Sequence, residues 1–262
     1  MPKMSSKKRK RRDAILDLMQ TQKSVSVDEL VTTFGVSAQT VRRDINHLCH
    51  ENLLRRRHGG ADLFEKQLNL PYQQRKTTNS EAKEAIAHAA AALIPDDATV
   101  FFSIGTTPAF VAEALRARKR LTVVTNNLNV VMALSNELTN RIIVPGGEVR
   151  LPDLDILGDE VTRFFEGYRA EFGICGVAGV AEDGALLDFH ASEVRVREQI
   201  RTACETSILV LDHTKFGRVA PVVGGNLGDA DRIIMDRAPD ARFAPVLERV
   251  ADRLILVEGG TP

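Results

Sequence analysis

The sequence predicts an α/β protein made of an N-terminal winged helix-turn-helix domain and a larger C-terminal α/β domain. Three observations lead to this prediction. Positive charge is concentrated in the first 60 residues, two short helices joined by a glycine turn precede an arginine-rich hairpin, and helical and extended segments alternate after residue 80. Such alternation is typical of an open, mostly parallel sheet covered by helices.

The charge of the 262-residue chain is divided between its two parts. Residues 1–60 hold thirteen Lys and Arg against six Asp and Glu, net +7, and the remaining residues hold 22 against 29, net −7. Hydrophobic residues make up 44% of the chain, which is enough for a sizeable core in a globular protein. The basic part therefore predicts a polyanionic partner, and the acidic part does not.

Several classes of protein are excluded by composition and motifs. No apolar run approaches the roughly 18–20 residues of a membrane span, and the basic residues 7–12 are followed by Asp13 rather than by the apolar stretch of a secretory signal. Cys49, Cys175 and Cys204 form no CxxC pair, so we expect neither a disulfide framework nor a zinc site. A cytoplasmic protein without a metal or redox cofactor is expected.

The first two helices follow from residue spacing. Residues 1–8 are expected to be a flexible basic tail, and apolar residues at helical intervals predict a helix over residues 10–22. Ser26 and Glu29 have the spacing of a capping box, in which each side chain accepts a hydrogen bond from the backbone of the other residue. The helix that they begin ends at Gly35.

A third helix is expected almost directly after this turn, from an N-cap at Ser37 to about residue 51. Val41, Ile45 and Leu48 form its buried stripe. Two short helices joined by a tight turn, the second with polar and arginine side chains early on its outer face, form a helix-turn-helix. The residues expected to contact DNA from this helix are Ser37, Gln39, Thr40, Arg42 and Arg43.

A small wing is predicted beside the third helix, because Gly59 and Gly60 can form a hairpin turn. The fork of an arginine meets phosphate oxygens, or the O6 and N7 atoms of guanine, in two parallel hydrogen bonds. An ordinary helical hairpin with a solvated arginine run is the alternative, but it does not explain why cap, turn, wing and charge coincide. We therefore expect a domain over residues 9–62 that binds double-stranded DNA. Its wing candidates are Arg55, Arg56, Arg57 and His58.

The second part of the chain follows a polar segment that contains Pro71. Residues 63–80 are expected to be a linker, and the α/β domain is expected over residues 81–262. Helices are predicted over residues 81–94 and 191–204. Short apolar runs, typical of strands buried on both faces, lie at residues 98–102, 121–124, 141–144, 172–177, 207–211 and 254–257.

Small, amide, hydroxyl and charged residues follow four of these strands, at the edge where open α/β sheets bind ligands. Gly105, Thr106 and Thr107 begin a helix, and the free amides at the start of a helix attract an anion. Each group alone is often only a turn, a cap or a surface ion pair, but together they predict a site for a phosphorylated polyol. His190 and His213 either line this site or have structural roles. The candidates are Gly105, Thr106, Thr107, Asn126, Asn127, Gly146, Gly147, Arg150, Asp212 and Lys215.

Segments in both parts of the chain resemble the DeoR family of bacterial repressors, and the resemblance extends over roughly residues 10–260. The resemblance implies a sensor domain related to the ribose-phosphate isomerase fold, a homo-oligomer (dimer or tetramer), and an operator affinity that falls when glycerol-3-phosphate or another sugar phosphate is bound. It also adds Glu193 to the effector-binding candidates. The family commonly has Asp at the position of Ser103, so the chain departs from it there. The resembling segments are residues 27–61, 104–108, 124–130, 172–177, 193–195 and 212–218.

Two other functions are compatible with some of these residues. A sugar-phosphate isomerase needs a carboxylate base and an electrophile, and Asp212, Glu148 or Glu193 with Lys215 could supply them. The neutral Ser103 and the DNA-binding domain speak against this function, so no catalytic residue is expected. An architectural DNA-binding protein that does not respond to an effector is the third possibility.

Overall fold

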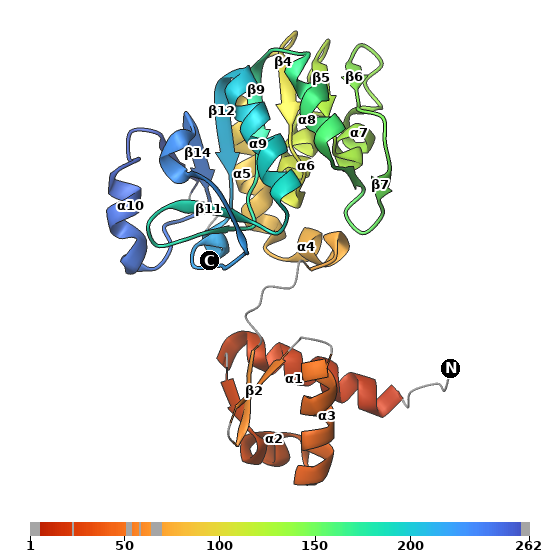
Figure 1. The fold of residues 1–262 in the computed structure, drawn as a ribbon, viewed down its shortest axis with the longest axis vertical. Helices are drawn as coiled ribbons and strands as arrows, with labels where there is room; N and C mark the ends of the chain where they lie inside the picture. The colour runs from red at the N-terminus through yellow and green to blue at the C-terminus, as the bar shows by residue number, and fades with distance from the viewer. Residues whose placement is uncertain (1–5, 23, 51–53, 58, 64–69, 258–262) are drawn as a thin grey trace. The chain divides into compact units, whose positions relative to one another are not determined.

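The computed structural model describes residues 6–22, 24–50, 54–57, 59–63 and 70–257. It divides the chain into two compact units, residues 1–68 and 69–262 (Figure 1). We call them, after the functions that the sequence predicts, the DNA-binding unit and the sensor unit. Each unit has a hydrophobic core of its own. None of the described helices is long and apolar enough to cross a membrane.

The DNA-binding unit has the winged helix-turn-helix arrangement that the sequence predicts. Its three short strands form an antiparallel sheet in the order β1-β3-β2. Strand β1 was not predicted from the sequence. The first helix begins at Ser6, so residues 6–8 of the expected tail are helical. Residues 1–5 of that tail lie outside the described residues. The elements are α1 (Ser6–Gln22), β1 (Ser24–Ser26), α2 (Val27–Phe34), α3 (Ala38–His50), β2 (Leu54–Arg57) and β3 (Gly60–Leu63).

The wing depends on Gly60, where strand β3 passes β1 very closely. A Cβ atom at Gly60 would lie 2.1 Å from the carbonyl oxygen of Val25, a distance that no side chain tolerates. The turn before it is tied to helix α2, because the amide of Val27 donates a hydrogen bond to the carbonyl of Gly59 at 2.9 Å. The glycine pair therefore forms the hairpin turn and also permits the third strand.

The sensor unit is built on a seven-stranded sheet in the order β15-β14-β12-β9-β4-β5-β6. All neighbouring strands in this sheet are parallel. The prediction of an open parallel sheet is confirmed, and β14 is a strand that the sequence reasoning missed. The strands are β4 (Thr99–Phe102), β5 (Thr122–Thr125), β6 (Arg141–Ile143), β9 (Ala170–Cys175), β12 (Cys204–Val210), β14 (Arg232–Met235) and β15 (Leu254–Leu256).

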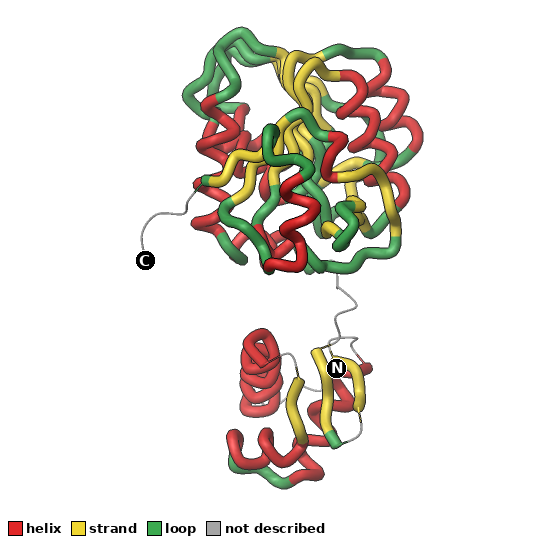
Figure 2. Tube along the Cα trace, turned by 90° about the vertical axis from the view of Figure 1, so that its left-hand side faces the viewer, coloured by secondary structure: helices red, strands yellow, loops and turns green. Residues whose placement is uncertain are grey.

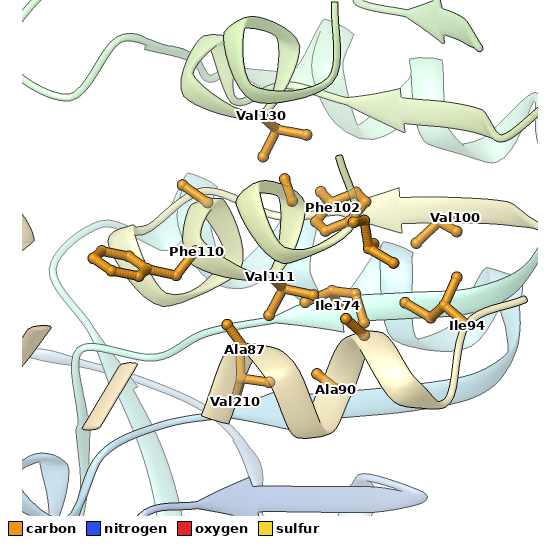
Figure 3. Close-up of a cluster of buried hydrophobic side chains, with 14 of the residues drawn as sticks. Ala87, Ala90, Ile94, Val100, Phe102, Phe110, Val111, Val130, Ile174 and Val210 are labelled. Atoms are coloured by element: carbon orange, nitrogen blue, oxygen red, sulfur yellow. The ribbon is translucent and has the colours of Figure 1, made fainter. Parts of the chain in front are cut away.

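Helices cover both faces of this sheet (Figure 2). Successive side chains of a strand point to opposite faces, so Val100 and Phe102 of β4 enter one core and Phe101 enters the other. Figure 3 shows the first core, where Ile94 and Val111 meet the strands. The first face is covered by α5 (Ser80–Ala92), α6 (Thr106–Ala114) and α7 (Leu128–Leu134), and the second by α8 (Asp159–Glu166), α9 (Ala191–Ala203) and α10 (Ala244–Glu248).

Short elements at the edge of the sheet complete the sensor unit. Residues 70–80, the second half of the expected linker, belong to this unit: they contain helix α4 (Tyr72–Thr77), whose Tyr72 is 3% exposed. Residues 64–69 of that segment lie outside the described residues. The other additions are the hairpin β7 (Val149–Arg150) and β8 (Asp155–Ile156), and a small antiparallel sheet of β10 (Gly179–Val180), β11 (Ala185–Asp188) and β13 (Val222–Asn226).

The strand order fixes where a ligand can bind. From β4 the chain proceeds to β5 and β6 on one side, and then returns to β9 and β12 on the other. The loops that leave β4 and β9 therefore run in opposite directions and leave a crevice at the carboxyl ends of these strands.

Candidate DNA-binding surface and effector pocket

A buried ion-pair cluster orients helix α3. Asp44, which is 2% exposed, accepts hydrogen bonds from the Nε atoms of Arg11 at 2.7 Å and Arg12 at 2.8 Å, both on α1. Asp44 lies on the same side of α3 as the buried Val41 and Ile45. The side of the helix that carries the candidate DNA contacts therefore faces solvent.

The outer face of α3 presents Gln39, Arg42 and Arg43, all of them exposed. Within the described part of the chain, neither of these arginines forms an ion pair, so both guanidinium groups are available for phosphate or guanine. Ser37 and Thr40 cap the helix: the Thr40 amide donates to Ser37 Oγ at 3.3 Å, and the two hydroxyls lie 3.0 Å apart. Thr40 is half-buried, whereas Ser37 is exposed at the start of the helix.

The wing carries Arg56 and Arg57 as exposed side chains. Arg56 is paired with Ala61 and Arg57 with Gly60 in the β2–β3 ladder. The backbone of Arg55 belongs to β2, but its side chain and the whole of His58 lie outside what the structure describes. Two of the four wing candidates are therefore placed beside the helix-turn-helix on exposed positions.

The candidate effector pocket lies at the crevice after β4 and β9 and encloses about 630 Å³ of empty space, including its opening to solvent. Gly105 begins helix α6 with a φ of +121°, and Thr106 and Thr107 are each 4% exposed. All three line the pocket. The first amides of a helix have no acceptor within the helix, and the helix dipole favours an anion there. This wall of the pocket fits a phosphate group.

Cationic side chains also line the pocket. Lys215 and Arg218 follow β12, and Arg75 comes from α4. Burial lowers the pKa of Lys215 to about 7, and the nearby charge of Arg218 acts in the same direction. A bound anion would offset both effects. Asp212 does not line the pocket; it accepts a hydrogen bond from the Thr214 amide at 3.0 Å and thereby fixes the turn that presents Lys215.

A network of carboxylates surrounds Arg150. Its Nε and Nη2 atoms donate to the two oxygens of Asp155 at 2.9 and 2.7 Å, and its Nη1 lies 3.1 Å from Glu193. Its Nη2 also lies 3.4 Å from Asp153. Burial lowers the pKa of Arg150, but the hydrogen bonds and charges of these carboxylates outweigh it and raise the pKa overall. Arg150 is therefore firmly held and permanently charged.

Glu193 of this network and one further carboxylate, Asp188, also line the pocket. Glu193 accepts hydrogen bonds from the amides of Phe189 at 3.1 Å and His190 at 3.3 Å, so it caps helix α9 as well as facing the pocket. Burial raises the pKa of Asp188 to about 6, although the charge of Arg197 opposes this shift. Within the described residues, no group of three or more His, Cys, Asp or Glu side chains is arranged to hold a metal ion.

Several candidates from the sequence do not line the pocket. Asn126 donates to the carbonyl of Ile156 at 2.8 Å, and Asn127 donates to the carbonyls of Ser103 at 3.3 Å and Gly105 at 3.2 Å. The NH2 groups of both side chains therefore donate to backbone carbonyls of neighbouring loops and support those loops. Gly146 and Gly147 likewise lie outside the pocket lining, as do His190 and His213.

Ser103 lies behind the pocket, between the loops that leave the two central strands. Its Oγ accepts a hydrogen bond from the amide of Gly176 at 3.3 Å and donates one to the carbonyl of Ile104 at 3.2 Å. A neutral hydroxyl therefore joins the loop after β4 to the loop after β9. This is the structural consequence of having Ser instead of Asp at this position.

Other pocket residues were missed by the sequence reasoning. The signals were weak, because α4 is too short to show a helical period and the acidic residues belong to segments with no recognisable pattern. Arg218 lies three residues after Lys215, within a segment that the sequence singled out, so it could have been found. The missed residues with polar side chains are Tyr72, Arg75, Asp153, Asp155, Asp188 and Arg218.

Comparison with known proteins identifies the family. Residues 11–67 match the DeoR-like helix-turn-helix domain, and residues 78–237 match the DeoR C-terminal sensor domain. The chain belongs to the DeoR family. It is 43% identical to the glycerol-3-phosphate regulon repressor of Escherichia coli (strain K12), over 92% of this chain and 96% of that protein. DeoR proteins are transcriptional regulators, so the predicted class, a DNA-binding repressor and not an isomerase, is confirmed.

Other similar proteins are also regulators of this class. The glycerol-3-phosphate regulon repressor of Haemophilus influenzae (strain ATCC 51907 / DSM 11121 / KW20 / Rd) is 37% identical over 95% of this chain and 97% of that protein. The HTH-type transcriptional repressor CsqR of Escherichia coli (strain K12) is 35% identical over 94% of each chain. Among solved structures, ribose 5-phosphate isomerase A from Neisseria gonorrhoeae is 17% identical, with a TM-score of 0.39 over 56% of each chain.

Proposed function

We propose that this DeoR-family repressor releases its operator when glycerol-3-phosphate binds in the pocket of the sensor unit. The observation that carries the proposal is the pairing, in one pocket, of the free amides at the start of α6 with the cations Lys215, Arg218 and Arg75. A phosphate dianion satisfies the amides and reduces the mutual repulsion of the cations. Another sugar phosphate is the alternative effector.

Two other residues that line the pocket suit the hydroxyl groups of a polyol. Asp188 and Glu193 supply carboxylate acceptors, and carboxylates are strong hydrogen-bond acceptors for hydroxyl donors. The names of two similar proteins, glycerol-3-phosphate regulon repressors of two bacteria, support glycerol-3-phosphate as the first effector to test.

The outer face of α3 and the wing are proposed to contact the operator. Gln39, Arg42 and Arg43 reach the major groove, and Arg56 and Arg57 contact the neighbouring backbone or bases. We further propose that the protein acts in the cytoplasm as a homo-oligomer, because a dimer presents two helix-turn-helix units to two half-sites.

The experiment is fluorescence anisotropy of labelled DNA from the region upstream of the protein's own operon, with and without glycerol-3-phosphate. Operator affinity should fall by about 5- to 150-fold when the effector saturates the protein, the usual range for such coupling. Glycerol and inorganic phosphate are the matched controls, since each carries half of the ligand's chemistry. Tight binding that ignores glycerol-3-phosphate but weakens with another sugar phosphate would reassign the effector.

A further inference from the structure

Arg75 of helix α4 contacts the pocket and the chain that arrives from the DNA-binding unit. Its Nη2 atom forms an ion pair with Asp153, which lines the pocket, and its Nε atom donates a hydrogen bond to the carbonyl of Leu70 at 2.8 Å. Leu70 is the first described residue after β3, seven positions beyond Leu63. One guanidinium group therefore joins a residue of the pocket to Leu70, the first described residue of the sensor unit.

The two contacts of Arg75, with Asp153 and with the carbonyl of Leu70, cannot change independently of each other. A guanidinium is planar and presents its N–H groups in a fixed fork. Nε and Nη2 lie on one edge of that fork, so turning the group to meet a new partner with Nη2 also turns Nε away from the carbonyl of Leu70. A change of partner in the pocket therefore breaks the hydrogen bond to Leu70.

Arg75 is also easier to displace than Arg150, the other guanidinium on Asp153. Asp153 is 7% exposed and keeps the Nη2 atom of Arg150 at 3.4 Å when Arg75 leaves, so its buried charge is not left alone. Arg150 in contrast is held by both oxygens of Asp155 and by Glu193. Less free energy is therefore lost when an incoming phosphate displaces Arg75 from Asp153 than when it displaces Arg150 from its carboxylates.

The backbone of α4 remains anchored during such a change. The Nζ atom of Lys83, a residue 3% exposed, donates to the carbonyl of Arg75 at 2.8 Å and to the carbonyl of Thr78. Tyr72 at the start of the helix is part of the core. The side chain of Arg75 can therefore change partners without unfolding the helix, and the contact that is lost is the one at Leu70.

We propose that Arg75 transmits the occupancy of the effector pocket to the DNA-binding unit. The phosphate of the effector takes the guanidinium from Asp153, the carbonyl of Leu70 loses its hydrogen bond, and the start of the sensor unit at Leu70 is released from α4. The released state has the lower operator affinity. This inference rests on the proposed function, because it requires an anionic effector in this pocket.

The test compares Arg75→Gln with Lys76→Gln in the full chain. Lys76 is the neighbouring cation on the same helix, but it forms a partly exposed ion pair with Glu113 and does not line the pocket. Operator affinity is measured by anisotropy with and without saturating glycerol-3-phosphate, and binding of glycerol-3-phosphate is measured directly by calorimetry. Arg75→Gln should bind the effector more weakly, because one of the cations of the pocket is lost, and its operator affinity without effector should already equal that of the saturated wild type. Lys76→Gln should respond as the wild type does.

The outcomes separate the inference from the proposed function. If Arg75→Gln has normal operator affinity and responds fully to saturating effector, another residue transmits the signal. If it loses effector binding but keeps normal operator affinity, Arg75 is a binding residue only. Either result overturns the inference. Hydrogen exchange on the wild type is a second readout: the amides of Leu70 and Tyr72 should exchange faster with effector, and those of the anchored helix after them should not change. Slower exchange at Leu70 and Tyr72 would also overturn the inference. A wild type that binds no phosphorylated ligand would refute the proposed function itself.

Discussion

The lowered pKa of Lys215 makes effector affinity depend on pH in a calculable way. With a pKa of about 7, Lys215 is half-protonated at neutral pH in the free protein. A phosphate dianion beside it raises its pKa towards or above the ordinary 10.5. Effector binding therefore takes up a proton, and the contribution of Lys215 to the affinity is fully present well below pH 7 and is lost as the pH rises through 7.

The size of the effect follows from this pKa. If only the protonated form binds the dianion, the affinity falls about fivefold between pH 7 and 8 and about tenfold between pH 8 and 9. The phosphate itself adds nothing in this range, because its second pKa is about 6 and it is already a dianion. Calorimetry in buffers of different ionisation enthalpy should show uptake of about half a proton at pH 7 and nearly one at pH 8.5.

Lys215→Arg is the matched control, because arginine keeps its charge throughout this range. Its effector affinity should be nearly constant between pH 7 and 9. An equally steep decline in Lys215→Arg, or a constant affinity in the wild type, would refute the reasoning that Lys215 is the titrating group at the phosphate.

Three further predictions concern single residues. Arg43→Ala should weaken operator binding by about 1–3 kcal/mol if it pairs with guanine, with effector affinity unchanged in calorimetry; unchanged operator affinity would remove Arg43 from the interface. Thr106→Val removes a hydroxyl at nearly constant volume, so effector affinity should fall by about 1.5–3 kcal/mol while operator affinity is unchanged. Loss of effector binding and operator binding together, with a lower unfolding temperature, would instead make Thr106 a structural residue. Gly60→Ala should destabilise the DNA-binding unit by more than about 1 kcal/mol, since its Cβ would meet the Val25 carbonyl at 2.1 Å; an unchanged unfolding midpoint would contradict this.

The parts of the fold that were predictable depend on local rules. The capping box at Ser26 and Glu29 is formed, with the Ser26 amide 2.6 Å from the Glu29 carboxylate and the Glu29 amide 3.1 Å from Ser26 Oγ. The helix that follows ends at Gly35 with a φ of +61°. These features need only neighbouring residues. Strand β1 and helix α4 were missed because they are three and six residues long and are stabilised by contacts with distant segments.

The candidate site was predictable where backbone direction alone decides it. Gly105 to Thr107 and Lys215 line the pocket because each follows a strand at the carboxyl edge of the sheet. Asn126 and Asn127 obey the same positional rule, but they turn their amides to the backbone of neighbouring loops. Which polar residue faces a pocket and which one supports it depends on tertiary contacts, and strand position does not contain that information.

The pocket is assembled from segments scattered between residues 72 and 218, whereas the helix-turn-helix and its core are complete by residue 63. During synthesis the DNA-binding unit therefore emerges first, and the last pocket residue follows about 150 positions after residue 68. At 5–20 residues per second this interval lasts roughly 8–30 s. During this interval a nascent molecule carries the DNA-binding unit without a complete pocket. Newly made protein therefore cannot bind the effector until synthesis has passed Arg218.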